Sequence, residues 1–235
     1  MARSSIVVLT GPGICLDGGI MAAHDGDSFW ERQLLEEAAV PMAYRQDPLR
    51  VQGFYNARRR RLAALEPTAA HLALARLEAA CPGDFLLVTA NADDLHERAG
   101  SLAPVHLFGE LLKARCTECH HVHPWAEDLD FSSCCPSCAT LGQLRPHLVW
   151  YGEPPLEMER IHAALAQCTC FLALGTPGHL HPAAGFLEDV PPLARTLVLD
   201  PQAGVETDGF REHLLGPADR EVADLVAKLL AEQGS

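Results

Sequence analysis

The chain has 235 residues, of which 48% are hydrophobic, enough to bury a sizeable core and to build one large domain with a smaller appended module. This composition is not typical of a disordered chain. The formal net charge of -13 disfavours nucleic acid and anionic membranes as partners. No apolar run is long enough to cross a bilayer and the first residues do not resemble a secretory signal, so we expect a cytoplasmic protein.

Apolar runs and helical patterns alternate along the chain. Buried parallel strands are predicted at Ile6–Thr10, Phe85–Thr89, Cys170–Gly175 and Thr196–Asp200. Helices are predicted at Thr68–Ala80, with Thr68 as its cap, Leu156–Ala166 and Asp219–Glu232. This alternation predicts a Rossmann-like α/β fold, a doubly wound parallel sheet whose ligands bind beyond the carboxyl ends of the strands.

Two segments interrupt the alternation and predict a smaller lobe. They are a helical insertion at residues 29–66 and a cysteine-rich module at residues 116–138. The large domain would then comprise residues 1–28, 67–115 and 139–235. We expect a cleft between the two lobes.

Five of the nine cysteines lie in the second insertion. Cys116, Cys119, Cys135 and Cys138 form two C-x-x-C pairs, the spacing of a closed tetrahedral zinc site. Such a site leaves no position for substrate, so we expect a structural role for the zinc. The spacing leaves open that Cys134 replaces Cys135, or that His120, His121 or His123 replaces a thiolate.

Four other motifs flank these cysteines in the chain. They are Gly11-Pro12-Gly13-Ile14-Cys15 with Gly19-Ile20, the run from Thr89 to Gly100, the run from Arg145 to Glu153, and the run from Gly175 to Ala184. Together with the cysteine pairs they resemble the sirtuins, the NAD-dependent protein deacylases, over nearly the whole chain. The resemblance implies NAD or a related nucleotide as cofactor and a small-molecule or acylated ligand as partner.

The resemblance also implies roles for individual residues. It implies catalytic roles for Asn91 and Asp93. It implies cofactor contacts from Gly11, Pro12, Gly13, Ile14, Asn91, Asp93, Gly175, Thr176 and Asp200. It implies substrate contacts from His147, Val149, Trp150, Tyr151 and Gly152, although His147 is also consistent with a structural histidine.

Tyr55-Asn56-Ala57-Arg58 resembles the bacterial sirtuins that remove succinyl and malonyl groups. On a helix Tyr55 and Arg58 face the same way, so a hydroxyl and a guanidinium can converge on one carboxylate. The alternative is that the run from Arg58 to Arg61 is a solvated basic face, which we favour for the other arginines but not for Arg58.

The largest departure from the family is Phe108, which stands where sirtuins carry their catalytic histidine. That histidine acts as a base on the cofactor ribose after nicotinamide has left, and a phenyl ring cannot take a proton. Loss of a general base costs about a hundredfold to ten-thousandfold in rate. His106 lies two residues away, but the family often carries a polar residue there together with the catalytic one.

Further departures cluster around the same ligand. Ala23, His24, Ala90 and Ala92 replace larger or polar residues of the family, which predicts a wider and less polar pocket. Pro12 and Pro177 each delete a backbone N–H in a turn that normally cradles phosphate. Asp200-Pro201 replaces an Asn-Leu pair on the adenosine side.

Cys15 replaces a serine after the glycine loop. If it lies at a helix N-terminus, the helix dipole lowers its pKa, and with His24 and Asn91 nearby it resembles a nucleophilic site. The alternative is a small buried residue in place of serine.

Three functions fit this pattern. The first is a diverged sirtuin with impaired standard deacylation, repurposed as an enzyme on a small acyl-, carboxylate- or nucleotide-derived ligand. The second is a NAD-dependent lysine deacylase, acting on succinyl or acetyl groups with low efficiency. The third is a non-catalytic protein that binds NAD, ADP-ribose or an acyl ligand.

Overall fold

The computed structural model describes residues 5–15, 37–81, 83–176, 178, 182–200 and 209–233. Six strands form the larger sheet, in the order β3-β2-β1-β7-β8-β9, and every pair is parallel. The strands are β1 (Ser5–Thr10), β2 (Asp84–Thr89), β3 (Val105–His106), β7 (Cys170–Leu174), β8 (Arg195–Asp200) and β9 (Glu212–Leu215). All four predicted strands and the predicted α/β fold are confirmed.

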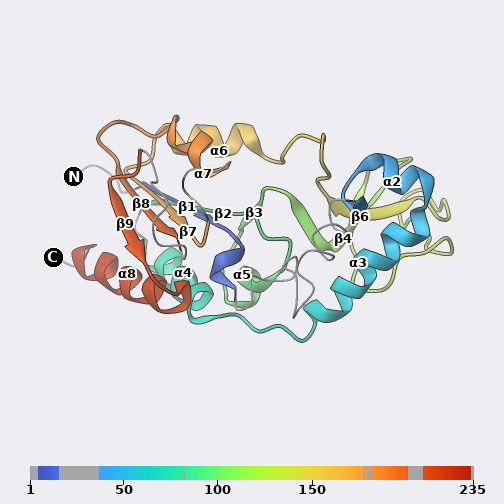
Figure 1. The fold of residues 1–235 in the computed structure, drawn as a ribbon, viewed down its shortest axis with the longest axis horizontal. Helices are drawn as coiled ribbons and strands as arrows, with labels where there is room; N and C mark the ends of the chain where they lie inside the picture. Colours follow the sequence, from blue (N-terminus) through green and yellow to red (C-terminus); the bar gives the residue numbers. More distant parts are fainter. Residues whose placement is uncertain are drawn as a thin grey trace.

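Helices cover both faces of this sheet, as Figure 1 shows. They are α4 (Ala69–Ala80) and α8 (Ala218–Gln233) on one face, and α6 (Met158–Leu165) and α7 (Ala183–Leu187) on the other. Successive side chains of a strand point to opposite faces. In β1, Ile6 and Val8 accordingly pack with α4 and α8, whereas Val7 and Leu9 pack with α6 and α7. The sheet is therefore buried on both sides, which explains its continuous apolar strands.

The helix predictions hold with one shift. Thr68 is the cap of α4, as predicted. The helix α6 begins at Met158, two residues later than the predicted Leu156, because Glu157 adopts a left-handed conformation with φ of 56° and cannot be part of the helix. None of the described helices is long and apolar enough to span a membrane.

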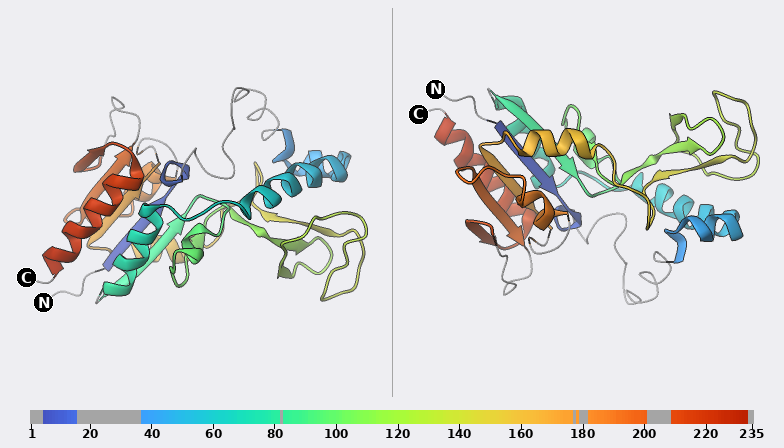
Figure 2. Two further views of the ribbon diagram at one scale, coloured as in Figure 1. Left: turned by 90° about the horizontal axis from the view of Figure 1, so that it is seen from below. Right: turned by 90° about the horizontal axis from the view of Figure 1, so that it is seen from above.

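A second sheet and two helices lie at the far end of the molecule (Figure 2). The antiparallel strands are β4 (Gly109–Cys116), β5 (Val122–Pro124) and β6 (Leu144–Leu148), in the order β5-β4-β6. The helices are α2 (Pro41–Gln46) and α3 (Pro48–Leu62). The domain boundaries stay a prediction, but β4 and β6 pair with each other in this second sheet, although the sequence analysis assigns both to the larger domain.

Two short elements complete the fold. The 3-10 helix η1 (Pro12–Ile14) follows β1, and α5 (Leu95–Arg98) follows the loop after β2. Both lie at the carboxyl edge of the large sheet. Their loops supply most of the residues that the sequence predicts for cofactor binding.

Gly109 joins the two sheets and is expected to tolerate no side chain. Its φ is +84°, and a Cβ there collides with the carbonyl oxygen of His147 on the paired strand. We expect Gly109→Ala to lower the free energy of unfolding by about 2–4 kcal/mol in urea denaturation. The matched control is Gly53→Ala on α3, where a Cβ meets open space and helix propensity adds about 0.5–1 kcal/mol. Equal stability of the two variants would contradict this account of the junction.

Candidate functional site

Loops at the carboxyl ends of β1, β2 and β7 meet at one edge of the sheet. The amide of Gly13 donates to the carbonyl of Gly175 at 2.9 Å, and that of Ala90 to Thr10 at 2.8 Å. Gly175 has φ of +64°, and a Cβ there lies 2.5 Å from the amide nitrogen of Ile14. Only glycine permits this approach. The structure thus brings together the cofactor-binding residues predicted at positions 11–14, 91, 93, 175 and 176.

The backbone N–H groups of the glycine loop, residues 11–15, already donate hydrogen bonds within the protein. Gly11 and Gly13 donate across to the β7 end of the sheet, and the amides of Ile14 and Cys15 donate back to Gly11 and Pro12 within the turn. Pro12, the first residue of η1, has no N–H. Every backbone donor of residues 11–15 is therefore engaged within the protein, in contrast to an open phosphate cradle.

Some predicted residues cannot be placed. Ala23, His24, Pro177 and Pro201 lie outside the described residues. Asp200 ends β8, but its side chain is also outside them.

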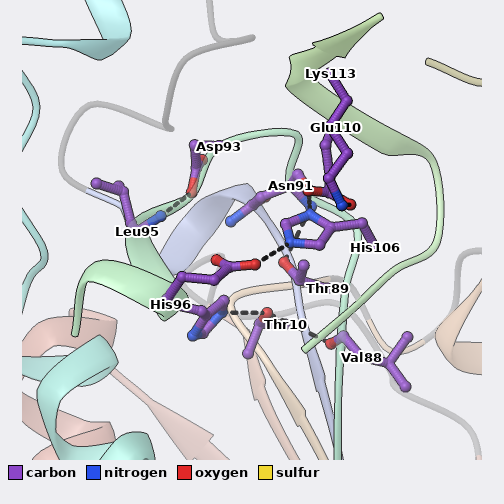
Figure 3. A network of polar contacts seen from close by, with 11 residues as sticks. Thr10, Val88, Thr89, Asn91, Asp93, Leu95, His96, His106, Glu110 and Lys113 are labelled. Atoms are coloured by element: carbon purple, nitrogen blue, oxygen red, sulfur yellow. Dashed lines mark hydrogen bonds and ion pairs between the residues drawn. The ribbon is translucent and has the colours of Figure 1, made fainter. Parts of the chain in front are cut away.

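Asn91 and Asp93 are buried in the loop after β2. The Asn91 side chain donates to the carbonyl of Gly11 at 3.2 Å, which ties this loop to the glycine loop. Asp93 accepts the amide of Leu95 at 3.3 Å (Figure 3). Burial raises the pKa of Asp93 to about 6, against a smaller lowering by that hydrogen bond. A carboxyl with this pKa exchanges protons near neutrality.

The prediction of an activated Cys15 thiol stays a prediction, since its predicted partner His24 lies outside the described residues. Within them, Cys15 follows the last residue of η1, at the C-terminal end of that short helix. Burial and the neighbouring Asp93 carboxylate instead raise the pKa of the thiol far above its usual range. Its neighbours are His71, 3.9 Å from the sulfur, together with Asp93 and Asn91. At neutral pH this group is a protonated thiol and a poor nucleophile.

A pocket of about 350 Å³ lies beside these loops, and most of its lining is apolar. It is lined by Ala39, Tyr55, Ala90, Ala92, Phe108, Leu148, Val149, Trp150, Tyr151, Gly152 and Glu153. Five of the seven predicted substrate residues therefore border it, namely Tyr55, Val149, Trp150, Tyr151 and Gly152. Arg58 and His147 are not among the lining residues, and His147 pairs with Glu110 between β6 and β4, in keeping with the structural alternative. Phe108 is part of the wall, as are Ala90 and Ala92.

One wall of the pocket is held by an ion pair that sequence reasoning did not identify. Arg145 makes two hydrogen bonds of 2.8 Å to the Glu153 carboxylate, and its guanidinium carbon lies 3.6 Å from the centre of the Trp150 ring. Glu153 also accepts the Trp150 amide at 2.9 Å. These bonds occupy the one carboxylate among the lining residues, and the pKa of Glu153 is lowered because Arg145 and the Trp150 amide outweigh its burial. The signal in the sequence was an Arg and a Glu enclosing an apolar run.

Tyr55 and Arg58 are both buried, so the solvated-face alternative is wrong for Arg58. The Tyr55 ring stacks on Trp150 with centroids 6.3 Å apart, and the Arg58 guanidinium lies over Phe54 at 3.6 Å. Burial raises the pKa of Tyr55 although the charge of Arg58 opposes the shift, so its hydroxyl remains a neutral donor.

Arg59 also differs from the prediction that it belongs to a solvated basic face. It is buried, and it donates to the carbonyl of Leu111 at 3.1 Å and to Asn56 at 2.7 Å. Its position, four residues after Tyr55, places it on the inner face of α3. Arg60 is exposed and pairs with Asp128, as expected for a solvated face.

His106 is not placed to replace the missing base. Its Nδ1 lies 3.1 Å from the carbonyl oxygen of Asn91 and its Nε2 lies 2.8 Å from Glu97 (Figure 3). A carbonyl and a carboxylate only accept hydrogen bonds, so both ring nitrogens carry a proton. Burial lowers the pKa of His106, but the hydrogen bond and charge of Glu97 outweigh it and raise the pKa above its ordinary value. His106 therefore ties the Asn91 loop to Glu97 of α5.

The four predicted zinc ligands converge. The Sγ atoms of Cys116 and Cys138 are 3.7 Å apart, those of Cys119 and Cys135 are 3.6 Å apart, and all four lie within 4.8 Å of one another. Four thiolates at this spacing fit a tetrahedral zinc ion, with Zn–S bonds of about 2.3 Å. Cys134 is exposed and outside the group, and within the described chain no histidine replaces a thiolate, although His123 lies 3.8 Å from Cys135.

We expect Cys135→Ser to lose zinc and Cys134→Ser to retain it, because only the former sulfur belongs to the group. The measurement is zinc content per chain by metal analysis, with the melting temperature recorded in parallel. Removal of the ion with a chelator should destabilise the second sheet, since metal binding contributes folding energy to such modules. Full zinc retention in Cys135→Ser would show that the ligand set is wrong.

We expect the imidazole of His106 to titrate above its reference pKa of about 6.5, as followed by NMR. Glu97→Gln should shift this titration downward, because burial then dominates. A raised folded-state pKa stabilises the fold fully below about pH 6.5, and that stabilisation is lost as pH rises through the raised pKa. An unchanged titration in Glu97→Gln would contradict the assigned cause.

The geometry can be compared with known proteins. A sequence model of the Sir2 family matches residues 11–182. A NAD-dependent protein deacylase of Shigella flexneri is 43% identical over 98% of this chain and 85% of its own length. A protein of the same description from Vibrio parahaemolyticus is 43% identical over 97% of this chain and 95% of its own length.

Solved structures agree with these sequences. A Sir2 homolog in complex with NAD has a TM-score of 0.83 at 31% identity, over 98% of this chain and 90% of that chain. A Sir2 homologue mutant in complex with ADP ribose also has a TM-score of 0.83 at 31% identity, over 97% of this chain and 93% of that chain. The resemblance seen in the sequence is confirmed: this chain belongs to the Sir2 family, the sirtuins.

Proposed function

We propose that this sirtuin has kept the acyl-binding pocket of its family while standard NAD-dependent deacylation is impaired, and that it acts on a small acyl-, carboxylate- or nucleotide-derived ligand. The observation that carries the proposal is Phe108 in the wall of the pocket. The family histidine implied at this position takes a proton from the cofactor ribose. Among the described lining residues no other group is available for that task, because Glu153 is bound to Arg145 and Tyr55 is held neutral.

The cofactor end of the cleft supports the same proposal. Gly11, Gly13, Asn91, Asp93, Gly175 and Thr176 are the residues that would hold NAD, which when bound supplies an electrophilic ribose carbon for acyl transfer. The chain retains the close glycine contact that lets a nucleotide approach the backbone. The backbone amides of residues 11–15 already donate hydrogen bonds within the protein, so we expect the chain to bind a pyrophosphate more weakly. Nucleotide binding is therefore expected to be looser than in the relatives.

A second function, low-efficiency lysine deacylation, is favoured by a different observation. Asn91 and Asp93 are buried and hydrogen-bonded at the junction of the glycine loop and the pocket. The described relatives with 43% identity are NAD-dependent protein deacylases. Asp93, with its pKa raised to about 6, offers a proton acceptor that Phe108 does not. Turnover measurements distinguish this function from the first, and ligand binding without turnover would indicate the non-catalytic alternative.

We expect nicotinamide release from NAD with acetyl- or succinyl-lysine peptides to be at least about a hundredfold slower than for the Shigella flexneri relative. Phe108→His should raise the rate because it restores a proton acceptor in the wall of the pocket. Phe108→Leu is the matched control, since it changes the side chain without adding a titratable group. Turnover by the unmodified chain at the rate of the relative would overturn the impairment.

We expect the pocket to prefer acidic ligands, because the buried Arg58 guanidinium and the Tyr55 hydroxyl can hold one carboxylate. Calorimetry with succinyl-lysine and butyryl-lysine should show tighter binding of the acidic compound. Arg58→Ala should weaken only that compound, by about tenfold or more. Arg60→Ala, an exposed arginine of the same helix, is the control. Equal affinities, unaffected by Arg58→Ala, would remove the acidic-ligand proposal and leave an apolar acyl pocket.

A further inference from the structure

A second group of potential metal ligands lies at the cofactor end of the cleft, far in sequence from the zinc cysteines. Cys15 follows η1, His71 lies in the first turn of α4, and Asp93 lies in the loop after β2. The Cys15 sulfur is 3.9 Å from His71 Nε2 and 3.9 Å from Asp93 Oδ2. The three ligand atoms all lie within 4.8 Å of one another, and all three residues are more than nine-tenths buried.

We propose that Cys15, His71 and Asp93 form a three-ligand site for a zinc-class divalent ion. A thiolate, an imidazole and a carboxylate are the donors that zinc takes in proteins, at bond lengths of about 2.0–2.3 Å. Those bond lengths place neighbouring ligand atoms of a tetrahedron about 3.3–3.6 Å apart. The two distances from the Cys15 sulfur exceed this spacing by a few tenths of an ångström. The His71 and Asp93 ligand atoms, within 4.8 Å of each other, have further to close before a coordination sphere with one open position forms.

Each ligand is already oriented by a second contact, as metal ligands usually are. His71 Nδ1 lies 2.8 Å from the Thr68 hydroxyl, which itself donates to the carbonyl of Ile14 at 3.0 Å and so can accept the Nδ1 proton. The other oxygen of Asp93 accepts the Leu95 amide at 3.3 Å. The Thr68 amide, 3.2 Å away, donates to Nδ1 and so leaves the ring proton on Nε2. Metal binding by Nε2 therefore requires the ring to change tautomer and to give up this bond.

Charge and proton balance support the same assignment. In the described part of the chain no lysine or arginine forms an ion pair with Asp93, although it is buried. Binding of a divalent ion exchanges the thiol proton for a sulfur–metal bond and releases that proton to solvent. One thiolate, one carboxylate and one divalent cation then sum to zero charge, which is the arrangement that a buried site tolerates best. Asn91, 3.5 Å from the sulfur, adds a donor to the thiolate.

The site belongs to this chain rather than to its family. The sirtuin resemblance implies a serine at position 15, and a serine hydroxyl remains protonated near neutrality and is a weak ligand. The Cys15 thiolate supplies what that hydroxyl lacks. An ion here would lie beside the glycine loop, where the family binds its nucleotide.

The test uses the full chain loaded with one equivalent of Zn²⁺ for the four-cysteine site and then titrated with Co²⁺. We expect one further equivalent to bind, with a thiolate-to-cobalt charge-transfer absorption. Cys15→Ser should lose this absorption completely, and Asp93→Asn should weaken binding at least tenfold. Cys170→Ser, which removes another buried thiol, is the matched control and should bind like the unmodified chain. Circular dichroism confirms that each variant is folded.

The result that overturns the proposal is equally direct. If the unmodified chain and Cys15→Ser take up the same amount of Co²⁺ with the same spectrum, Cys15 is not a ligand. If Asp93→Asn binds with unchanged affinity, the carboxylate is not one either. Each outcome is read from metal binding alone, so it does not depend on the function of the pocket.

Discussion

The close contact between two glycine loops is the constraint on which the site depends. Parallel pairing of β1 with β2 and β7 brings the carboxyl ends of three strands to one edge. Gly11 and Gly13 then lie against Gly175 at distances that exclude any Cβ. On the other side of β1, the loop after β2 brings Asn91 to within 3.5 Å of the Cys15 sulfur. A larger residue in either loop would separate the strands' ends and disperse the site.

A second constraint shapes the pocket rather than the edge of the sheet. The ion pair of the buried Arg145 with the partly buried Glu153 and the stacking of Arg145 on Trp150 fix the wall between β6 and α6. Removal of Glu153 would leave the buried charge of Arg145 without this partner. The pair also removes the only lining carboxylate from acid–base work. The described lining of the pocket is thus mostly apolar and aromatic, which suits the acyl chain proposed as its ligand.

The two constraints act on different parts of the family's fold. The second sheet, the Arg145 pair and Tyr55 shape the acyl-binding end. Phe108 alters the wall of the pocket, whereas Pro12 and the engaged amides alter the cofactor end. Changes at one end leave the other intact because the loop from Ala90 to Asp93 separates them, held by its own bonds to Thr10 and Gly11. Ligand binding and bond-making can therefore diverge independently.

Much of this was predictable from sequence, for physical reasons that differ between elements. Continuous apolar runs predict buried strands such as Ile6–Thr10. The spacing of the cysteines predicts the zinc site of Cys116, Cys119, Cys135 and Cys138. The edge strand β9 was missed because its residues alternate between half-buried and exposed. The direction of the Cys15 pKa shift could not be read from the sequence because it depends on burial and on Asp93, which is distant in sequence. Burial of Arg59 could not be predicted either. A run of four arginines predicts a solvated helix face unless the packing partners of the helix are known.

The central claim is that the acyl-binding end survives without the family's base. Its most direct test is calorimetry of an acyl-lysine peptide and the same peptide without the acyl group, both in the absence of cofactor. The account predicts that the acylated peptide binds and the bare peptide does not, since the pocket of about 350 Å³ contacts the acyl chain. Equal affinities for the two peptides, or no binding of either, would contradict it.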